Sequence, residues 1–271
     1  MARRRRGEGR RGVVIALVST VVVFTALGFA IVNAPGWPEI RQQFFDGHEF
    51  TSTFPEIASA FLLNVKIFCI SEAFILVLAL GLAVVRSLPG PVFFPVRALA
   101  VAYADFFRGV PTILVITLLG FGAPALGLQG VPTSDVFWAI VALVLVYSAY
   151  VAEVYRAGIE SVHPSQVASA RALGLSRRKT LWFVVLPQAV RRVIPPLLND
   201  FIGLQKDSAL VAFLGYTEAL RQSQIITAAD FDFTPYVALA LVYIVITIPQ
   251  ARLVDWMVAR DRKRRAAAVG V

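Results

Sequence analysis

The stretch SQVASARALGLSRRKTLWFVVLP, residues 165–187, lies between two strongly apolar segments of the chain. Pro164 suits the first turn of a helix, and the small residues that follow continue that helix. Gly174 is placed to end it in a left-handed turn. Ser176 can cap a basic second helix, which Pro187 should interrupt. The stretch therefore predicts a water-exposed pair of short helices, which is an unusual structure to find between two apolar segments.

The composition of the whole chain is that of a membrane protein. Of its 271 residues 58% are hydrophobic and only 16% are charged, and the mean hydropathy is +0.72. A soluble domain is roughly half apolar and about a quarter charged. The single cysteine, Cys69, excludes a disulfide framework within one chain, and two distant histidines leave little material for a zinc site or a histidine-based triad.

The hydropathy pattern predicts an all-α polytopic protein with about six transmembrane helices, since each apolar segment is close to the ~20 residues that span a bilayer. The predicted spans are residues 13–33, 58–85, 98–121, 135–156, 193–214 and 235–258. Basic residues gather in the two tails and in the loops at 86–97 and 157–192, whereas the outer loops contain only Arg41 and Arg221. The positive-inside rule then places both termini in the cytoplasm.

The net charge of +9 does not indicate a nucleic-acid partner, because the basic runs flank apolar spans and so set the membrane topology. The first span could instead be a secretory signal. Its apolar run of about 20 residues is longer than a signal core of 7–15, which favours an uncleaved anchor. Cleavage would leave five spans without reversing any of them.

The usual motifs of enzymes are missing from the sequence. There is no Gly-Lys pair and hence no Walker A motif, and GEGRRG at residues 7–12 matches the dinucleotide fingerprint by letters alone, without a strand before it. The metalloprotease and serine-hydrolase patterns are also missing. We therefore expect no catalytic residues, no metal site and no cofactor bound by this chain.

The fifth predicted span carries an unusual number of polar residues, in RRVIPPLLNDFIGLQKDSAL at residues 191–210. Asn199 and Lys206 are seven residues apart, Asp200 adjoins Asn199, and Gly203 falls within the same helical stripe. Ionisable side chains inside a span are costly and usually face a bundle interior or an aqueous path. The stripe predicts one wall of a translocation path, but the same residues could equally hold neighbouring helices together.

Two pairs of oppositely charged residues are spaced three apart, which places both members on one face of a helix. These pairs are Asp105 with Arg108 and Glu153 with Arg156. We expect each to form a local ion pair near the cytoplasmic interface.

The quoted loop resembles the EAA loop of ATP-binding-cassette (ABC) importer permeases. The pattern of that loop is Glu-Ala-Ala, three residues, Gly, nine residues, Ile, one residue and Leu-Pro. This chain has the same spacing, with Ala168, Ser169, Ala170, Gly174, Leu186 and Pro187 at the corresponding positions. Ala168 replaces the glutamate that names the motif, so the loop lacks one ionic contact of the family pattern.

The resemblance extends over roughly residues 55–262 and is to the polar amino-acid permeases of the histidine/glutamine/arginine type. It rests on FFRGVPTILV (106–115), AYVAEVYRAGIESV (149–162) and LPQAVRRVIPPLLNDFIGLQKDSAL (186–210), which occur in the same order. It implies a type I ABC importer transmembrane domain at 55–262, with the EAA-like loop at about 157–187. Residues 1–54 would add a basic tail, an extra span and an outer loop, and residues 263–271 a cytoplasmic tail.

The resemblance also implies partners. A second permease chain, identical or different, would complete the path within the lipid of the cell membrane. Two ATPase chains carrying ATP and magnesium would grip the loops, and an extracellular or periplasmic binding protein would deliver a polar amino acid, whose identity the sequence does not specify. The alternatives are a secondary transporter driven by an ion gradient through Lys206, Asp200 and Glu153, and a membrane scaffold without transport.

Overall fold

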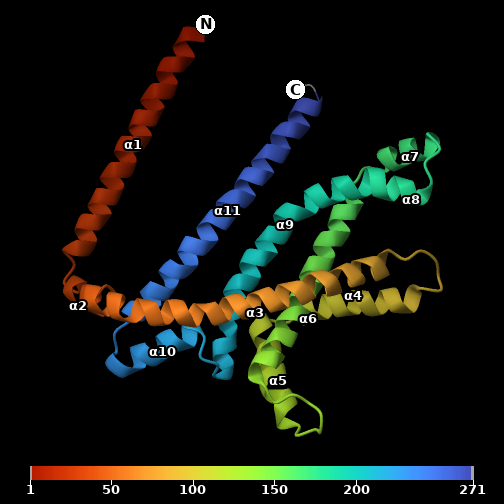
Figure 1. The fold of residues 1–271 in the computed structure, drawn as a ribbon. Coiled ribbons are helices and arrows are strands. Elements are labelled where there is room, and N and C mark those ends of the chain that lie inside the picture. The colour runs from red at the N-terminus through yellow and green to blue at the C-terminus, as the bar shows by residue number, and fades with distance from the viewer. Residues whose placement is uncertain (1, 270–271) are drawn as a thin grey trace.

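The computed structural model describes residues 2–269, with side chains for residues 11–261 and Lys263, and over that part every regular element is helical (Figure 1). The elements in chain order are α1 (Ala2–Val32), α2 (Trp37–Phe44), α3 (Gly47–Ser87), α4 (Phe94–Gly109), α5 (Thr112–Ala125), α6 (Asp135–Glu160), α7 (Pro164–Ala172), α8 (Arg177–Thr180), the π-helical turn η1 (Leu181–Val185), α9 (Leu186–Asp207), the 3₁₀ turn η2 (Ser208–Leu214), α10 (Ala219–Asp230) and α11 (Thr234–Val269). The predicted C-terminal tail begins within α11, and its last two residues lie outside the described residues.

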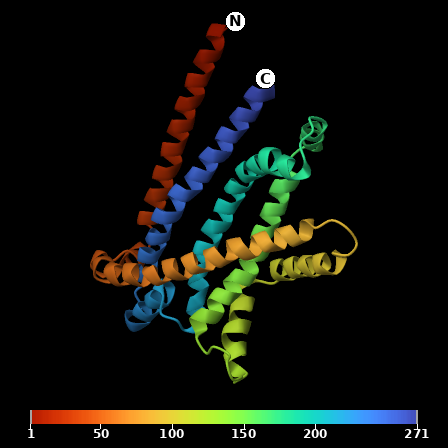
Figure 2. The ribbon, with the colours of Figure 1, turned by 45° about the vertical axis from the view of Figure 1, so that its right-hand side comes forward.

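The number of membrane spans agrees with the sequence. In the described part of the chain five helical stretches are long and apolar enough to cross a bilayer, and a bent pair of helices brings the number to six. The prediction of an all-α polytopic protein is confirmed. The short helices α2 and α10 were not predicted; in both views α10 lies at the opposite end of the bundle from α7 and α8 (Figures 1 and 2).

The third predicted span, residues 98–121, is wrong as a single straight helix. It consists of α4 and α5, which meet at an angle of 101°. The break is at Val110 and Pro111: Val110 is extended, with φ −99° and ψ 132°. Proline lacks an N–H to donate and disfavours a helical conformation in the residue before it, so the helix ends there. The hydropathy of the run remains high across the break and gives no sign of it.

Helix α3 begins earlier than the predicted span. Its cap is Asp46, whose Oδ1 accepts hydrogen bonds from the backbone N–H groups of His48 (2.8 Å) and Glu49 (3.0 Å). An acidic cap of this kind satisfies backbone donors that have no partner in the first turn. The helix then continues through Pro55, so the predicted domain boundary at 54/55 falls inside it.

The core forms where α3, α5, α6 and α9 pack together with η2. Its fully buried side chains include Ile75, Ile116, Leu143 and Leu204. Small residues bring the helices close, since a methyl group on Gly158 of α6 would overlap Val193 of α9. By contrast, the described side chains of α1 are exposed along its length, and Figure 1 shows α1 apart from the bundle.

Candidate functional site: an exposed loop and a polar helix face

The first turn of α7 is stabilised by residues of the loop itself. Nδ1 of His163 accepts a hydrogen bond from the backbone N–H of Ser165 at 3.2 Å and also lies 2.7 Å from its hydroxyl oxygen. Pro164 occupies the first helical position, where no N–H is required. The start of this short helix is therefore fixed by local chemistry rather than by contacts with distant parts of the chain.

The end of α7 is fixed in the same way. Gly174 has φ +83°, a conformation that side chains with a Cβ rarely adopt. Its N–H donates to the carbonyl oxygen of Arg171 (3.0 Å), and the N–H of Leu175 donates to that of Ala170 (3.1 Å). These two bonds are those of a Schellman motif. The left-handed end expected at Gly174 is present.

One side of α7 packs against the protein and the other is open. Ala170 is buried, and the small cluster beneath the helix consists of Val162, Val185 and Ala189. Ala168 and Ser169 are exposed, and the side chain of Leu173 is 84% exposed at the tip of the loop. The loop thus presents a surface of small residues with one projecting leucine, which a second protein could approach closely.

The prediction that Pro187 interrupts the second helix is wrong. Ser176 caps α8 by accepting from the N–H of Lys179 at 3.3 Å, and the chain then remains helical through η1 into α9. The N–H of Leu186 reaches back five residues to the carbonyl oxygen of Leu181. This π-helical turn accommodates the missing N–H of Pro187 within a continuous helix. Leu186 and Pro187 therefore lie at the base of the loop, in the first turn of α9.

The polar residues of α9 lie on one broad face of the helix but differ in burial. Asn199 and Lys206 are exposed on one side of the helix. Asp200 and Gly203 are half-buried, and a methyl group on Gly203 would lie 3.2 Å from the hydroxyl oxygen of Tyr147 on α6. The rotation of about 100° per residue explains the separation of adjacent Asn199 and Asp200.

The buried side of α9 contains carboxylates without basic partners. The hydroxyl of Tyr147 donates to Oδ2 of Asp207 at 2.9 Å, whereas Oδ2 of Asp200 is buried without a hydrogen-bond partner. Glu72 on α3 lies close enough to Asp200 for their charges to interact. Among the described residues, none of these three acids belongs to an ion pair. The proximity of Glu72 and Asp200 could not be predicted from the sequence, because packing brings the two acids together.

One of the two predicted local ion pairs is present. Glu153 pairs with Arg156, which also pairs with Glu160, and Arg86 of α3 approaches the same Glu153 at 2.8 Å. The other prediction is wrong: Asp105 and Arg108 do not pair, and the guanidinium of Arg108 lies 5.9 Å from the ring centroid of Tyr150. Arg86 was missed because it is 67 residues away from Glu153 in the sequence.

The described residues contain no group of three or more His, Cys, Asp or Glu side chains arranged to hold a metal ion.

Comparison with known proteins agrees with this architecture. Residues 92–263 match the family model described as binding-protein-dependent transport system inner membrane component. The chain belongs to this family. As a permease of this family it is a multi-pass protein of the cell membrane, and both the coupling-loop candidates and the polar face of α9 lie within the matched region.

The relatives of this permease include several amino-acid transport proteins of Bacillus subtilis (strain 168). A probable glutamine ABC transporter permease protein is 35% identical over 69% of this chain and 84% of its own length. An arginine transport system permease protein is 32% identical over 74% and 91% of the two chains. An L-cystine transport system permease protein is 33% identical over 81% and 91%.

The permease also resembles solved structures. One, titled as an amino acid ABC transporter with histidines, shares 29% identity with a TM-score of 0.71, covering 79% of this chain and 98% of the other. A chain of the MetNI methionine ABC transporter in an inward-facing conformation shares 18% identity with a TM-score of 0.54, which supports the fold alone.

Proposed function

We propose that this permease is the membrane-spanning subunit of an ATP-driven importer for a polar amino acid. In this proposal the loop at 157–187 couples it to two separate ATPase subunits. The observation that carries the proposal is α7, a helix fixed at both ends by local bonds, with Ala168, Ser169 and Leu173 left exposed. A helix that is rigid yet uncovered can transmit the movement of a protein docked against it.

Further support comes from the relatives, whose names include glutamine, arginine and L-cystine transport. Their substrates share the α-amino and α-carboxylate groups of an amino acid. The energy source would be on other chains, since this sequence has no Walker A motif. ATP and magnesium would accordingly bind the ATPase partners. A second permease chain and an external binding protein would complete the assembly.

For the translocation path we propose the side of α9 that contains Asp200 and Gly203, together with Glu72 and Asp207. Carboxylates without basic partners inside a membrane protein usually mark a path for a substrate or an ion. Their negative charge favours a substrate that brings an ammonium or guanidinium group. Asn199 and Lys206 lie about 100° around the helix from Asp200, on an exposed strip where they are available to a neighbouring chain.

The ion-gradient alternative has no support from the comparisons, because the family transports with the help of binding proteins and the relatives named above are transport-system permeases. The scaffold alternative is weakened by the same evidence. The acidic side of α9 is compatible with either mechanism, so a functional test must address the loop.

The test is a substitution at Gly174. Asn tolerates a left-handed backbone better than other side chains, and the space around Gly174 is open within this chain, so Gly174→Asn should fold normally. We expect it to obstruct the ATPase. In vesicles containing the whole transporter, both uptake and substrate-stimulated ATP hydrolysis should fall by about tenfold or more, which corresponds to ~1.4 kcal/mol of lost interaction.

Gly90 provides a matched control. It lies in the α3–α4 loop, predicted to be cytoplasmic, with φ +92° and no atom within 4 Å of an added Cβ, so Gly90→Asn makes the same chemical change outside α7. This variant should retain uptake and ATP hydrolysis. Equal activity of Gly174→Asn and Gly90→Asn would refute coupling through α7, as would uptake that persists without any ATPase but stops when an ionophore is added.

A further inference from the structure

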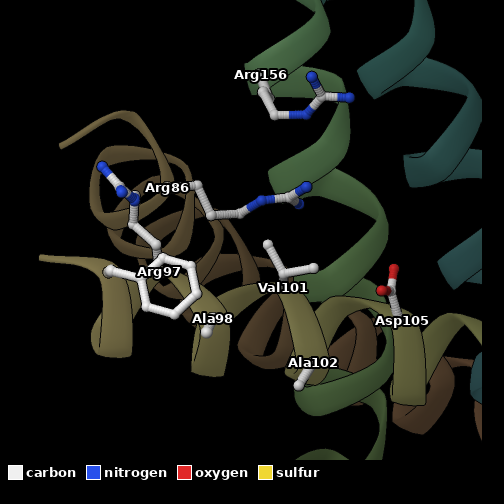
Figure 3. A pocket seen from close by; sticks show the side chains of 8 residues that line it. Arg86, Arg97, Ala98, Val101, Ala102, Asp105 and Arg156 are labelled. Atoms are coloured by element: carbon white, nitrogen blue, oxygen red, sulfur yellow. The ribbon is translucent and has the colours of Figure 1, made fainter. Parts of the chain in front are cut away.

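A cavity of about 640 Å³ lies between the C-terminal end of α3, the beginning of α4 and α6, away from both α7 and the acidic side of α9. It is lined by charged residues and small apolar ones: Arg86, Phe94, Arg97, Ala98, Val101, Ala102, Asp105 and Arg156 (Figure 3). Three guanidinium groups from three helices line this one cavity. The residues that line this cavity belong neither to α7 nor to the proposed translocation path.

The three arginines are bonded very differently. Glu153 binds both Arg86 and Arg156, and the side chain of Arg86 is only 13% exposed, so both are held in place. Arg97 donates one hydrogen bond, from Nη1 to the carbonyl oxygen of Leu88 at 2.6 Å, and forms no ion pair within the described residues. A guanidinium has five N–H donors, so most of those on Arg97 remain available to a ligand.

The end of the cavity at Arg97 is suited to an anion for a second reason. Helix α4 is 16 residues long and begins at Phe94, so the positive end of its dipole lies beside Arg97. Pro95 has no N–H, and the N–H groups of Phe94 and Arg97 already donate to backbone carbonyls, so the dipole and not these donors favours an anion here. Figure 3 shows Arg97 near one end of the cavity and Asp105 near the other. The anionic group would accordingly bind at the Arg97 end, away from the carboxylate of Asp105.

The Arg97 end of the cavity is surrounded by apolar side chains that are exposed. The side chains of Val92, Phe94 and Leu99 are all exposed, at the beginning of a helix that the positive-inside rule predicts to enter the membrane from the cytoplasmic side. Exposed apolar side chains beside a basic cavity at the inner boundary of a membrane match a lipid, which brings a charged headgroup and acyl chains together. A free phosphate ion would use the arginines but leave this apolar surface uncovered.

We infer that this cavity binds an anionic phospholipid of the inner leaflet, with its phosphate at Arg97 and the N-terminus of α4 and its acyl chains along Phe94 and Leu99. Arg86 and Arg156 are balanced by Glu153 and Glu160, so the positive charge that is free to meet the phosphate is that of Arg97. The lipid joins the ends of α3, α4 and α6 at the membrane surface. This inference requires only that the chain spans a membrane and does not depend on which solute the transporter carries.

The experiment is native mass spectrometry of the full-length permease, purified in the complex it forms and titrated with phosphatidylglycerol or phosphatidylcholine. We expect phosphatidylglycerol to bind at least several-fold more tightly. Arg97→Gln should weaken its binding about tenfold, the loss expected for one charge-assisted contact. The control is Arg252→Gln, which removes the same charge from an exposed arginine of α11, paired only with Asp255 at 3.7 Å and outside the cavity. Equal losses in both variants, or none in Arg97→Gln, would overturn the inference.

Asp105→Asn distinguishes the lipid from a zwitterionic ligand. An amino acid could place its carboxylate at Arg97 and its ammonium group at Asp105, and removing the acid would weaken its binding. Phosphatidylglycerol has no cation, so Asp105→Asn should leave its binding unchanged or strengthen it. Displacement of the lipid by inorganic phosphate or by a free amino acid at millimolar concentration would show that the site is built for a soluble anion or zwitterion, and would contradict the proposal.

Discussion

Two short helices connect spans at opposite ends of this permease, and they are held in opposite ways. The 12-residue α10 has a buried side with Ala219, Ser223 and Thr227, and its cap, Glu218, has an exposed fraction of 0%. The nine-residue α7 buries only Ala170 and is capped by an exposed histidine and a glycine. One helix is part of the protein interior, whereas the other is a surface feature.

The bonds explain this difference. The carboxylate of Glu218 accepts from the N–H groups of Leu220 and Arg221 and, at 2.7 Å, from the side-chain amide of Asn64 on α3, whose oxygen in turn accepts from the N–H of Ala219. Helix α10 is thus fixed to a residue 154 positions away from its cap. Helix α7 instead uses bonds within its own loop. A helix that is stabilised locally can keep its surface free for a partner.

The largest predicted effect is at the buried cap. Glu218→Ala removes the acceptor for three donors, two of them backbone groups, and leaves Asn64 partly unsatisfied in the interior. We expect a loss of about 3 kcal/mol in the free energy of unfolding. Chemical denaturation of the purified transporter, followed by intrinsic fluorescence, would measure it. A loss below about 0.5 kcal/mol would mean that α10 is no more firmly fixed than α7.

The same cap should make stability depend on pH. Burial raises the pKa of Glu218, although hydrogen bonds from Leu220, Arg221 and Asn64 act in the opposite direction. The folded state therefore binds the proton more tightly than the unfolded state, so the contribution of Glu218 is fully present below its unfolded pKa and is lost as the pH rises through the folded value. Compared with Glu218→Gln, the wild type should have its relatively highest melting temperature at and below pH 4.5, the ordinary pKa of a glutamate, and should lose that advantage as the pH rises. If the difference in melting temperature between the wild type and Glu218→Gln stayed constant up to pH 8, this prediction would be contradicted.

A pair of substitutions on α7 separates its two sides. Ala170→Leu places a large side chain at the buried position of α7 and should cost about 1–3 kcal/mol locally. Ala168→Leu adds the same atoms on the exposed side, so stability should stay within about 0.5 kcal/mol while stimulated ATP hydrolysis decreases. Unfolding and ATPase assays on both variants would show the contrast. Equal stabilities would mean that α7 does not rest on the cluster as the structure shows.

The smallest predicted effect is at the cap of α7. His163→Ala removes the ring nitrogen that accepts from Ser165, and for an exposed cap we expect about 0.5–1 kcal/mol. Limited proteolysis should reveal faster cutting within residues 163–175, with an unchanged global melting temperature. If the melting temperature falls as far as in Glu218→Ala, the distinction between a local and an interior helix is not valid.

Much of this architecture was evident from the sequence because it depends on local properties. Apolar runs near bilayer length identified the spans, and Gly174 indicated the end of α7 because a left-handed turn needs a residue without a Cβ. The spacing of three residues between Glu153 and Arg156 was also sufficient to predict their ion pair, since both face one side of a single helix.

The effect of proline on the helices was predicted wrongly at two positions, with a bend missed at one and a helix end expected wrongly at the other. Pro111 bends a span that hydropathy presents as continuous, and Pro187 leaves a helix continuous where the sequence suggested a stop. A proline determines only that one backbone N–H is missing and that the preceding residue disfavours a helical conformation. Whether the chain turns or forms a π-helical turn depends on what the adjacent helices allow.

The sequence by itself determined that the chain crosses a membrane and that α7 ends at Gly174, and it predicts which side the basic loops face. These properties follow from the solvation of individual segments and from backbone conformations of single residues. Only the tertiary structure decided that Glu72 approaches Asp200, that Asn64 binds Glu218, and that Arg86 joins Glu153. Contacts between residues far apart in the chain depend on how helices cross and rotate, and no single segment contains that information.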